Sequence, residues 1–395
     1  EKVYGDPVNT AEQLAQKMSF HGFSAEAYAK QLQSLVVRGW LTLTNDVYAI
    51  TKEGQAVRWQ AERDTDQLFY QGWDLSDEEM ADMKQLMEAL ITAVTPPDNN
   101  TLYEQTLLTR AKIGALYGEK LQNKTQESNL SSWGLLLLMI GQSNASETVS
   151  VDSILAQIPY MNPETLKAHL ADTAEAGFLM ENGAGYHLNE AGKSIVSTTL
   201  ASVSGWVNQN IAVDAETLET VCQTLQQISQ GFQNAPEPEA KPSLKSAQFH
   251  SPTGENPILL RISRTIAEIA AFRDDVHVAA FNKYDVPAHE WEAFSHVWGE
   301  NIWGDRVNTA VDVSQKLGFR GYGEQDYTTA LEASVTRGWL TKNEKNVYAL
   351  TEKGKAIREE AEQETNRLFF TPWQLFAPRE LNALHQGLQE IQKAL

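Results

Sequence analysis

Hydrophobic residues near the start of the chain recur at helical spacing on both sides of a short turn. Thr10 can cap a helix that places Leu14 and Met18 on one face. Ser24 can cap a second helix, whose inward face would carry Tyr28, Leu32, Leu35 and Val36. This succession of helix, tight turn and helix predicts a helix-turn-helix.

The pattern then changes from helical spacing to alternation. Residues 40–44 and 47–50 alternate as two half-buried strands, and Asn45-Asp46 between them has the chemistry of a hairpin turn. Thr51 can cap the next helix, and Gly54 would let that helix approach the hairpin closely. The hairpin is therefore the expected wing of a winged helix.

The same pattern occurs three times. The segment ending in Arg337-Gly338-Trp339-Leu340 aligns without a gap on the segment ending in Arg38-Gly39-Trp40-Leu41, and a fainter copy places Gly177-Phe178 on Gly39-Trp40. Such self-similarity is typical of an array of one structural unit. We predict a mainly α fold with short β-hairpins, built from three tandem winged helix-turn-helix units with accessory helices.

The repeats suggest three domains: an N-terminally incomplete unit at 1–95, a divergent unit at 101–232 and the most complete unit at 256–395. Proline-containing stretches at 95–100 and 233–257 read as linkers, the second of them flexible. Because Glu1 aligns with Glu300, the sequence begins inside a repeat. We therefore expect it to be a fragment, or to have lost its first half-unit.

Accessory helices are expected in the second and third units. The spacing predicts one helix from Thr101 to about Gln122 and a buried helix turn at the apolar run 135–140. Ahead of the last helix-turn-helix it predicts three separate helical pieces, at 258–272, 277–281 and 287–298.

The composition narrows the range of partners. The formal charge is −20, and each third of the chain is acidic, which argues against a partner with a phosphate backbone. Cys222 is the only cysteine, as expected of a cytoplasmic protein, and it excludes a disulfide framework. The longest apolar run is far below the ~20 residues that span a bilayer, so we expect no membrane partner.

The passage "RGWLTKNEKNVYALTEKGKAIRE" resembles the wing and following helix of MarR- and PadR-type winged helix regulators. Residues 258–395 are similar to the SalK-like helix-turn-helix proteins of bacteria, through "DDVHVAAF" at 274–281, the Arg-Gly-Trp region, the Gly354 helix and Trp373. These resemblances imply a bacterial regulator, with DNA contact as the default expectation.

The helices that would read DNA are poor in basic residues. Groove reading needs Arg, Lys, Asn or Gln near the start of the second helix, but two of the three copies are acidic there. The candidate nucleic-acid contacts are Arg38, Arg337, Lys342 and Lys345. Because a helix C-terminus favours a cation whatever its function, we interpret Arg38 and Arg337 as structural, with phosphate contact as the alternative.

A cluster of histidine and aromatic residues precedes the last helix-turn-helix. It provides the candidate ligand-binding residues: His277, Phe281, Trp291, His296, Trp298 and Trp303. Such a cluster can line a pocket for a flat aromatic ligand. The alternative, which we favour, is an ordinary core of large side chains packing helix against helix.

No catalytic motif and no metal site are expected. His289 and His296 are seven residues apart, too far for a metal clamp at i, i+4, and no cofactor can be assigned. Glu290, Glu292 and the acidic run at 359–364 are interpreted as solvated helix faces.

Three functional classes remain open from the sequence. The first is a regulator-like protein that binds a small molecule or a protein more than DNA. The second is an acidic scaffold for protein interactions. The third is a DNA-binding regulator of MarR type.

Overall fold

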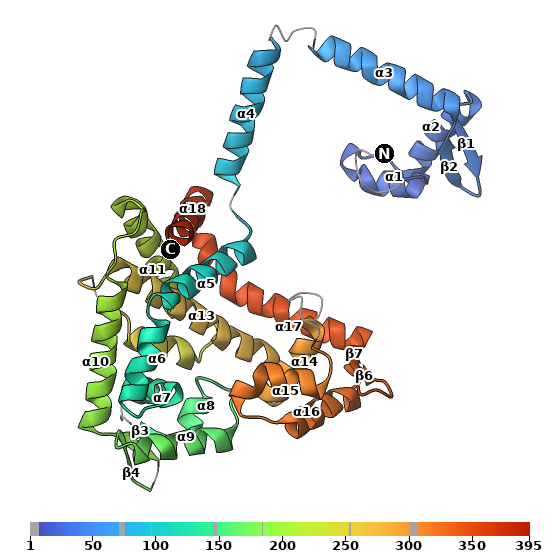
Figure 1. Cartoon of the computed structure of the whole chain (residues 1–395). Coiled ribbons are helices and arrows are strands. Elements are labelled where there is room, and N and C mark those ends of the chain that lie inside the picture. Colours follow the sequence, from blue (N-terminus) through green and yellow to red (C-terminus); the bar gives the residue numbers. More distant parts are fainter. Residues whose placement is uncertain are drawn as a thin grey trace. The chain divides into compact units, whose positions relative to one another are not determined.

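The computed structural model describes residues 8–70, 76–95, 97–144, 148–183, 185–252, 254–299 and 307–395. They form two compact units, Glu1–Ala89 and Leu90–Leu395. Both units are mainly helical with short antiparallel hairpins, which confirms the predicted fold class (Figure 1).

The N-terminal unit contains the first repeat in the expected order. Its elements are α1 (Ala11–Lys17), η2 (Ser19–His21), α2 (Ala25–Val37), β1 (Leu41–Thr44), β2 (Val47–Ile50), α3 (Lys52–Tyr70) and most of α4 (Asp77–Val94). Thr10 and Ser24 cap α1 and α2 as predicted. Asn45 and Asp46 both have positive φ, the backbone that a two-residue hairpin turn needs.

The middle repeat opens the C-terminal unit. It comprises α5 (Asn99–Ala115), α6 (Gly118–Glu127), α7 (Ser132–Ser143), β3 (Thr148–Val149), α8 (Val151–Leu155), α9 (Pro163–Glu175), β4 (Leu179–Glu181), β5 (Tyr186–Leu188), α10 (Glu190–Val207) and α11 (Ala215–Asn234). The prediction of a single helix from Thr101 to about Gln122 is wrong, because the helix is interrupted between the end of α5 and the start of α6. The apolar run forms the buried face of α7, and β3 adds a third strand to the hairpin.

The last repeat is preceded by long accessory helices. Its elements are α12 (Pro242–Phe249), α13 (Ile258–Asn282), α14 (Ala288–Trp298), α15 (Ala310–Leu317), η4 (Gly318–Arg320), α16 (Glu324–Thr336), β6 (Leu340–Lys342), β7 (Tyr348–Leu350), α17 (Glu352–Phe370), η5 (Pro372–Leu375) and α18 (Pro378–Ala394). Two predictions fail here. The helical pieces at 258–272 and 277–281 form one continuous helix, and the expected linker contains α12, whose Leu244 is buried.

Each repeat is closed in the same way. A glycine in the left-handed conformation ends the second helix: Gly39, Gly177 and Gly338. The cap of the next helix, Thr51, Asn189 or Thr351, donates a hydrogen bond to that glycine's carbonyl oxygen, at 2.6, 2.8 and 2.7 Å. A Cβ at the following glycine would overlap the carbonyl oxygen of the first hairpin residue, as predicted for Gly54.

Helix α13 organises the C-terminal unit. It packs against α5, α11, α12 and α17, and thirteen of its residues are buried (Figure 1). Phe232, Phe272 and Phe369 stack where α11, α13 and α17 meet. Trp373 of η5 packs at a tilt against Phe232 and Phe369. The middle and last repeats therefore share one hydrophobic core around this helix.

The two helix-turn-helix motifs of this unit also touch directly. The backbone N–H of Asn162, the cap of α9, donates to the carbonyl oxygen of Arg320 in the turn of the last motif at 2.9 Å. Thr165 donates to the carbonyl oxygen of Gly321 at 3.3 Å. The start of α9 is thus packed against the neighbouring repeat.

Among the helices of the described residues, none combines the length and the apolar character that crossing a bilayer requires.

Candidate functional site

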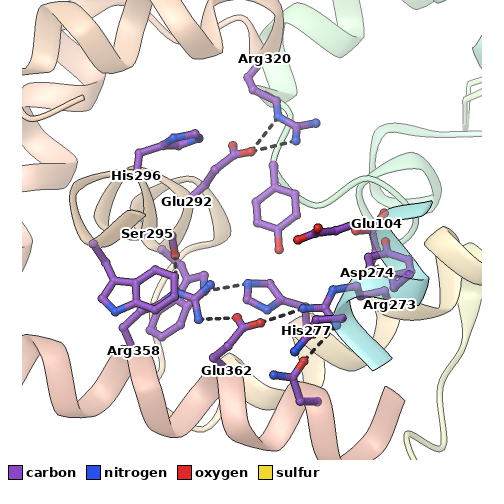
Figure 2. Close-up of a pocket in the computed structure, with 16 residues that line it drawn as sticks. Glu104, Arg273, Asp274, His277, Glu292, Ser295, His296, Arg320, Arg358 and Glu362 are labelled. Carbon is purple, nitrogen blue, oxygen red and sulfur yellow. Dashed lines mark hydrogen bonds and ion pairs between the residues drawn. The ribbon is translucent and has the colours of Figure 1, made fainter. Parts of the chain in front are cut away.

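A half-open cavity of about 680 Å³ lies in the C-terminal unit, at the junction of the middle and last repeats. Figure 2 shows its lining, which comes from α5, α13, α14 and α17, with Tyr160 and Arg320 reaching in from the connecting segments. Ionic and aromatic side chains lie next to each other along it. The lining residues are Asn100, Tyr103, Glu104, Tyr160, Arg273, Asp274, His277, Trp291, Glu292, Ser295, His296, Trp298, Arg320, Arg358, Glu362 and Asn366.

His277 is held as a neutral imidazole in one tautomer. The indole Nε1–H of Trp291, which can only donate, gives a hydrogen bond of 3.1 Å to His277 Nε2. The ring proton must therefore sit on Nδ1, which lies 3.2 Å from the hydroxyl oxygen of Thr365. That hydroxyl donates its own proton to the carbonyl oxygen of Ala361, so it accepts from His277. Burial lowers the pKa of His277 to about 3, in keeping with this bonding.

Arg358 forms part of the cavity wall and is nearly inaccessible to solvent. Its guanidinium lies 4.3 Å from the ring centroid of Trp298, donates from Nε to Ser295 Oγ at 3.1 Å, and pairs with Glu362 at 2.8 Å. Arg273 pairs with the other oxygen of Glu362 at 2.7 Å. Burial alone would raise the pKa of Glu362, but the two arginines hold it below its usual value.

Arg320 enters the cavity from the turn of the last helix-turn-helix. It pairs with Glu292 at 2.8 Å and lies over the ring of Tyr160 at 5.2 Å. Burial raises the pKa of the Glu292 carboxyl, an effect that Arg320 opposes. All three arginines of the cavity are thus already paired with a carboxylate of the protein.

Two carboxylates differ from these paired groups. Asp274 and Glu104 form no hydrogen bond or ion pair with the part of the chain that the structure describes. Asp274 is open to the cavity, yet it is set deep enough among protein atoms that desolvation raises its pKa to about 6, and Asp275 adds to the rise. Figure 2 shows Glu104 and Asp274 on the same side of the cavity.

The structure brings four of the six predicted ligand-binding residues to this cavity: His277, Trp291, His296 and Trp298. Phe281 lies behind them, buried and stacked on Trp291 at 5.2 Å, so it belongs to the core that was the alternative interpretation. Trp303 lies outside the described residues. Burial lowers the pKa of His296 to about 4.

The interpretation of the acidic residues as solvated faces is wrong for three of them. Glu290 and Glu292 pair with Arg337 and Arg320, and Glu362 lies between Arg273 and Arg358. The cavity residues of α17 and α5 were missed because they lie about 60 and 170 residues from the aromatic cluster. The retention of Arg358, Glu362 and Thr365 in the first repeat, as Arg58, Glu62 and Thr65, was an available signal.

The four candidate nucleic-acid contacts have different surroundings. Arg337 pairs with Glu290 at 2.8 Å and lies over the ring of Trp339, and Arg38 lies 5.3 Å from the ring centroid of Trp40. Lys342 pairs with Glu332. Lys345 is exposed at the tip of the last hairpin.

This fold and cavity define a protein built of helix-turn-helix units with accessory helices and a half-open cavity between two of the repeats. The chain belongs to a helix-turn-helix family, whose model matches residues 8–98 and 157–395. The match includes the first and last helix-turn-helix motifs and, of the middle motif, the second helix α9. No curated protein and no solved structure matched the chain.

Proposed function

We propose that this chain is a regulator-like helix-turn-helix protein whose cavity binds a small molecule. The cavity itself carries the proposal, because its volume is within the range of ligand sites and it combines aromatic side chains with many charged and polar groups. The resemblance to MarR-, PadR- and SalK-like proteins supports the regulator-like class.

The charges of the cavity favour a flat aromatic ligand with a cationic group. Each of the three arginines is already paired with a carboxylate, Arg273 and Arg358 sharing Glu362, so an anionic ligand would have to compete with a paired carboxylate. Asp274 and Glu104 are available to a cation, and Tyr103, Tyr160 and Trp298 provide aromatic surface. An aromatic amine satisfies both requirements.

The packing of α9 supports a ligand-binding role over direct reading of DNA. A DNA-reading helix enters the major groove with its N-terminal residues. In the middle repeat this end of α9 contacts the turn of the last repeat, through Asn162 and Thr165. Together with the charge of −20, this contact disfavours DNA binding by the middle repeat.

Native mass spectrometry of the freshly purified protein tests the proposal directly. We expect a retained small molecule that is lost in Trp298→Ala and in Asp274→Asn. Trp59→Ala, which changes an exposed indole in the N-terminal unit, is the matched control and should keep the adduct.

A thermal-shift comparison covers the case of a ligand lost in purification. Aromatic amines should raise the melting temperature of the wild-type protein, while aromatic carboxylates of equal size should not. Stabilisation by the carboxylates alone, or by neither set when no adduct is found, would refute the proposal.

A further inference from the structure

In the last repeat, helices α13 and α14 cover the inner side of the helix-turn-helix motif and the helix α17 that follows it. Helix α14 packs on α16, where Tyr327, Ala330, Leu331 and Ser334 are buried. Helices α13 and α14 cover α17, through the contacts of His277 with Thr365 and of Trp298 with Arg358. This cover is one continuous stretch of chain, residues 258–298.

The first repeat keeps the residues that receive this cover. At an offset of 300, Arg58, Glu62, Thr65 and Phe69 occupy the positions of Arg358, Glu362, Thr365 and Phe369. The local bonds are also kept: Arg58 pairs with Glu62, and Thr65 donates to the carbonyl oxygen of Ala61 at 2.7 Å.

The surroundings of these residues differ sharply between the repeats. The side chain of Arg58 is 64% exposed and that of Arg358 is 4% exposed. Phe69 is 60% exposed, whereas Phe369 is completely buried. Helix α2 has no buried residue among those described. The N-terminal unit therefore presents an apolar side with charges in fixed positions.

We propose that this side is a docking face for a helix pair of the α13–α14 kind. The first-repeat docking face consists of Tyr28, Leu32, Arg38, Arg58, Glu62, Thr65, Asp66, Leu68 and Phe69. The partner places an imidazole against Thr65 and an indole over Arg58. The two surfaces together form a second cavity of the type seen in the C-terminal unit.

The charges of the docking face specify the partner further. Arg273 of α13 bonds Glu362 and Asn366, whose counterparts are Glu62 and Asp66. Glu290 of α14 pairs with Arg337, whose counterpart is Arg38. The partner therefore carries a cation opposite Glu62 and a carboxylate opposite Arg38. This assigns Arg38 to a protein contact and not to a phosphate.

A fusion tests the proposal on the full chain. Residues 256–299 are copied and joined directly to Glu1, which aligns with Glu300, so the connectivity of the last repeat is reproduced. We expect amide exchange in α3 to slow by at least about tenfold in the fused protein. Binding of a dye specific for exposed apolar surface should fall, while exchange in α17 stays unchanged.

Two controls separate specific docking from nonspecific coverage. The protection of α3 should be lost when the fused copy carries His277→Ala and Trp298→Ala, and when the face carries Phe69→Glu. Phe249→Glu, at an equally exposed phenylalanine of the C-terminal unit, should leave it intact. Unchanged exchange in α3 on fusion would overturn the proposal. A dimer of the unfused chain that Phe69→Glu dissociates would also overturn it, in favour of a second copy as the occupant.

Discussion

Helices α3 and α17 carry an arginine, a glutamate and a threonine at equivalent positions, but in very different surroundings. Arg358 and Glu362 of α17 line a cavity and Thr365 bonds His277 of its wall, whereas Arg58, Glu62 and Thr65 of α3 face solvent. The backbone closure of the two repeats is nevertheless the same, down to the cap at Thr51 and Thr351. Among the residues that the structure describes, the motif of the first repeat thus forms without helices of the α13–α14 kind.

This difference separates two kinds of residue within one repeat. Glycine, cap and hairpin residues define the fold of the unit and work locally. The arginine, glutamate and threonine on the following helix acquire a defined environment only when α13 and α14 pack against them. Mutating a glycine, cap or hairpin residue should therefore change the stability of both repeats equally. Mutating the arginine, glutamate or threonine should change the stability of the covered repeat more than that of the uncovered one.

The largest difference in the free energy of unfolding is expected for the two equivalent phenylalanines, Phe69 and Phe369. Phe369→Ala removes a side chain stacked among Phe232, Phe272 and Tyr103, and should lower the free energy of unfolding of the C-terminal unit by about 3–5 kcal/mol. Phe69→Ala should cost well under about 1 kcal/mol, because its ring is largely exposed. Denaturant unfolding, read by amide exchange in α17 and α3, measures both. Equal losses would contradict the comparison.

Acid should destabilise the C-terminal unit through His277. The pKa is about 3 in the folded protein and about 6.5 in the unfolded chain, so the unfolded state takes up the proton first as the pH falls. The stabilisation is complete above pH 6.5 and is lost towards pH 3, with about 2–3 kcal/mol lost by pH 4.5.

His277→Asn provides the control for this pH dependence. Asparagine can accept from Trp291 and donate to Thr365, but it does not titrate. The variant should therefore show a shallower fall in stability between pH 6.5 and 4.5, measured by denaturant unfolding at each pH. An unchanged slope would show that the pKa of His277 is not lower in the folded protein than in the unfolded chain.

The sequence was sufficient to predict the local architecture. Caps at Thr10 and Ser24, the turn at Asn45-Asp46 and the close approach at Gly54 depend on a few neighbouring residues, and all four are confirmed. The break after Ala115 and the continuity of α13 were not predicted. Both occur where packing against distant helices decides whether a helix continues, and helical spacing alone does not contain that information.

The cavity was only half predictable for the same reason. The aromatic cluster of α13 and α14 is contiguous in sequence, so its part of the wall was found. Glu292 was misread because its exposure depends on Arg320, which reaches it from another element. Glu104 and Tyr160 come from the middle repeat, and no local pattern connects them to α17.

The glycine at which each post-hairpin helix approaches the hairpin should be equally sensitive to substitution in all three repeats, because it acts locally. A Cβ at Gly54, Gly192 or Gly354 would overlap the carbonyl oxygen of Trp40, Phe178 or Trp339. Alanine at each position should therefore cost about 1–3 kcal/mol through displaced backbone. Amide exchange in the helix that begins at each site gives the readout. A loss confined to Gly354→Ala would mean that the closure of the last repeat depends on its cover.

The smallest expected difference in stability is between Arg58→Lys and Arg358→Lys, which keep the positive charge. Arg358→Lys keeps a cation beside Glu362 but removes the planar group over Trp298 and the Nε–H that bonds Ser295. We expect a loss of about 1–2 kcal/mol in the C-terminal unit, as for a buried polar group left unbonded. Arg58→Lys should cost no more than about 0.5 kcal/mol, because an exposed pair at i, i+4 contributes little. Thermal unfolding of the two variants measures both losses. In the protein that carries the fused helix pair, Arg58→Lys should lower the stability as much as Arg358→Lys does, because an indole would then cover both guanidinium groups.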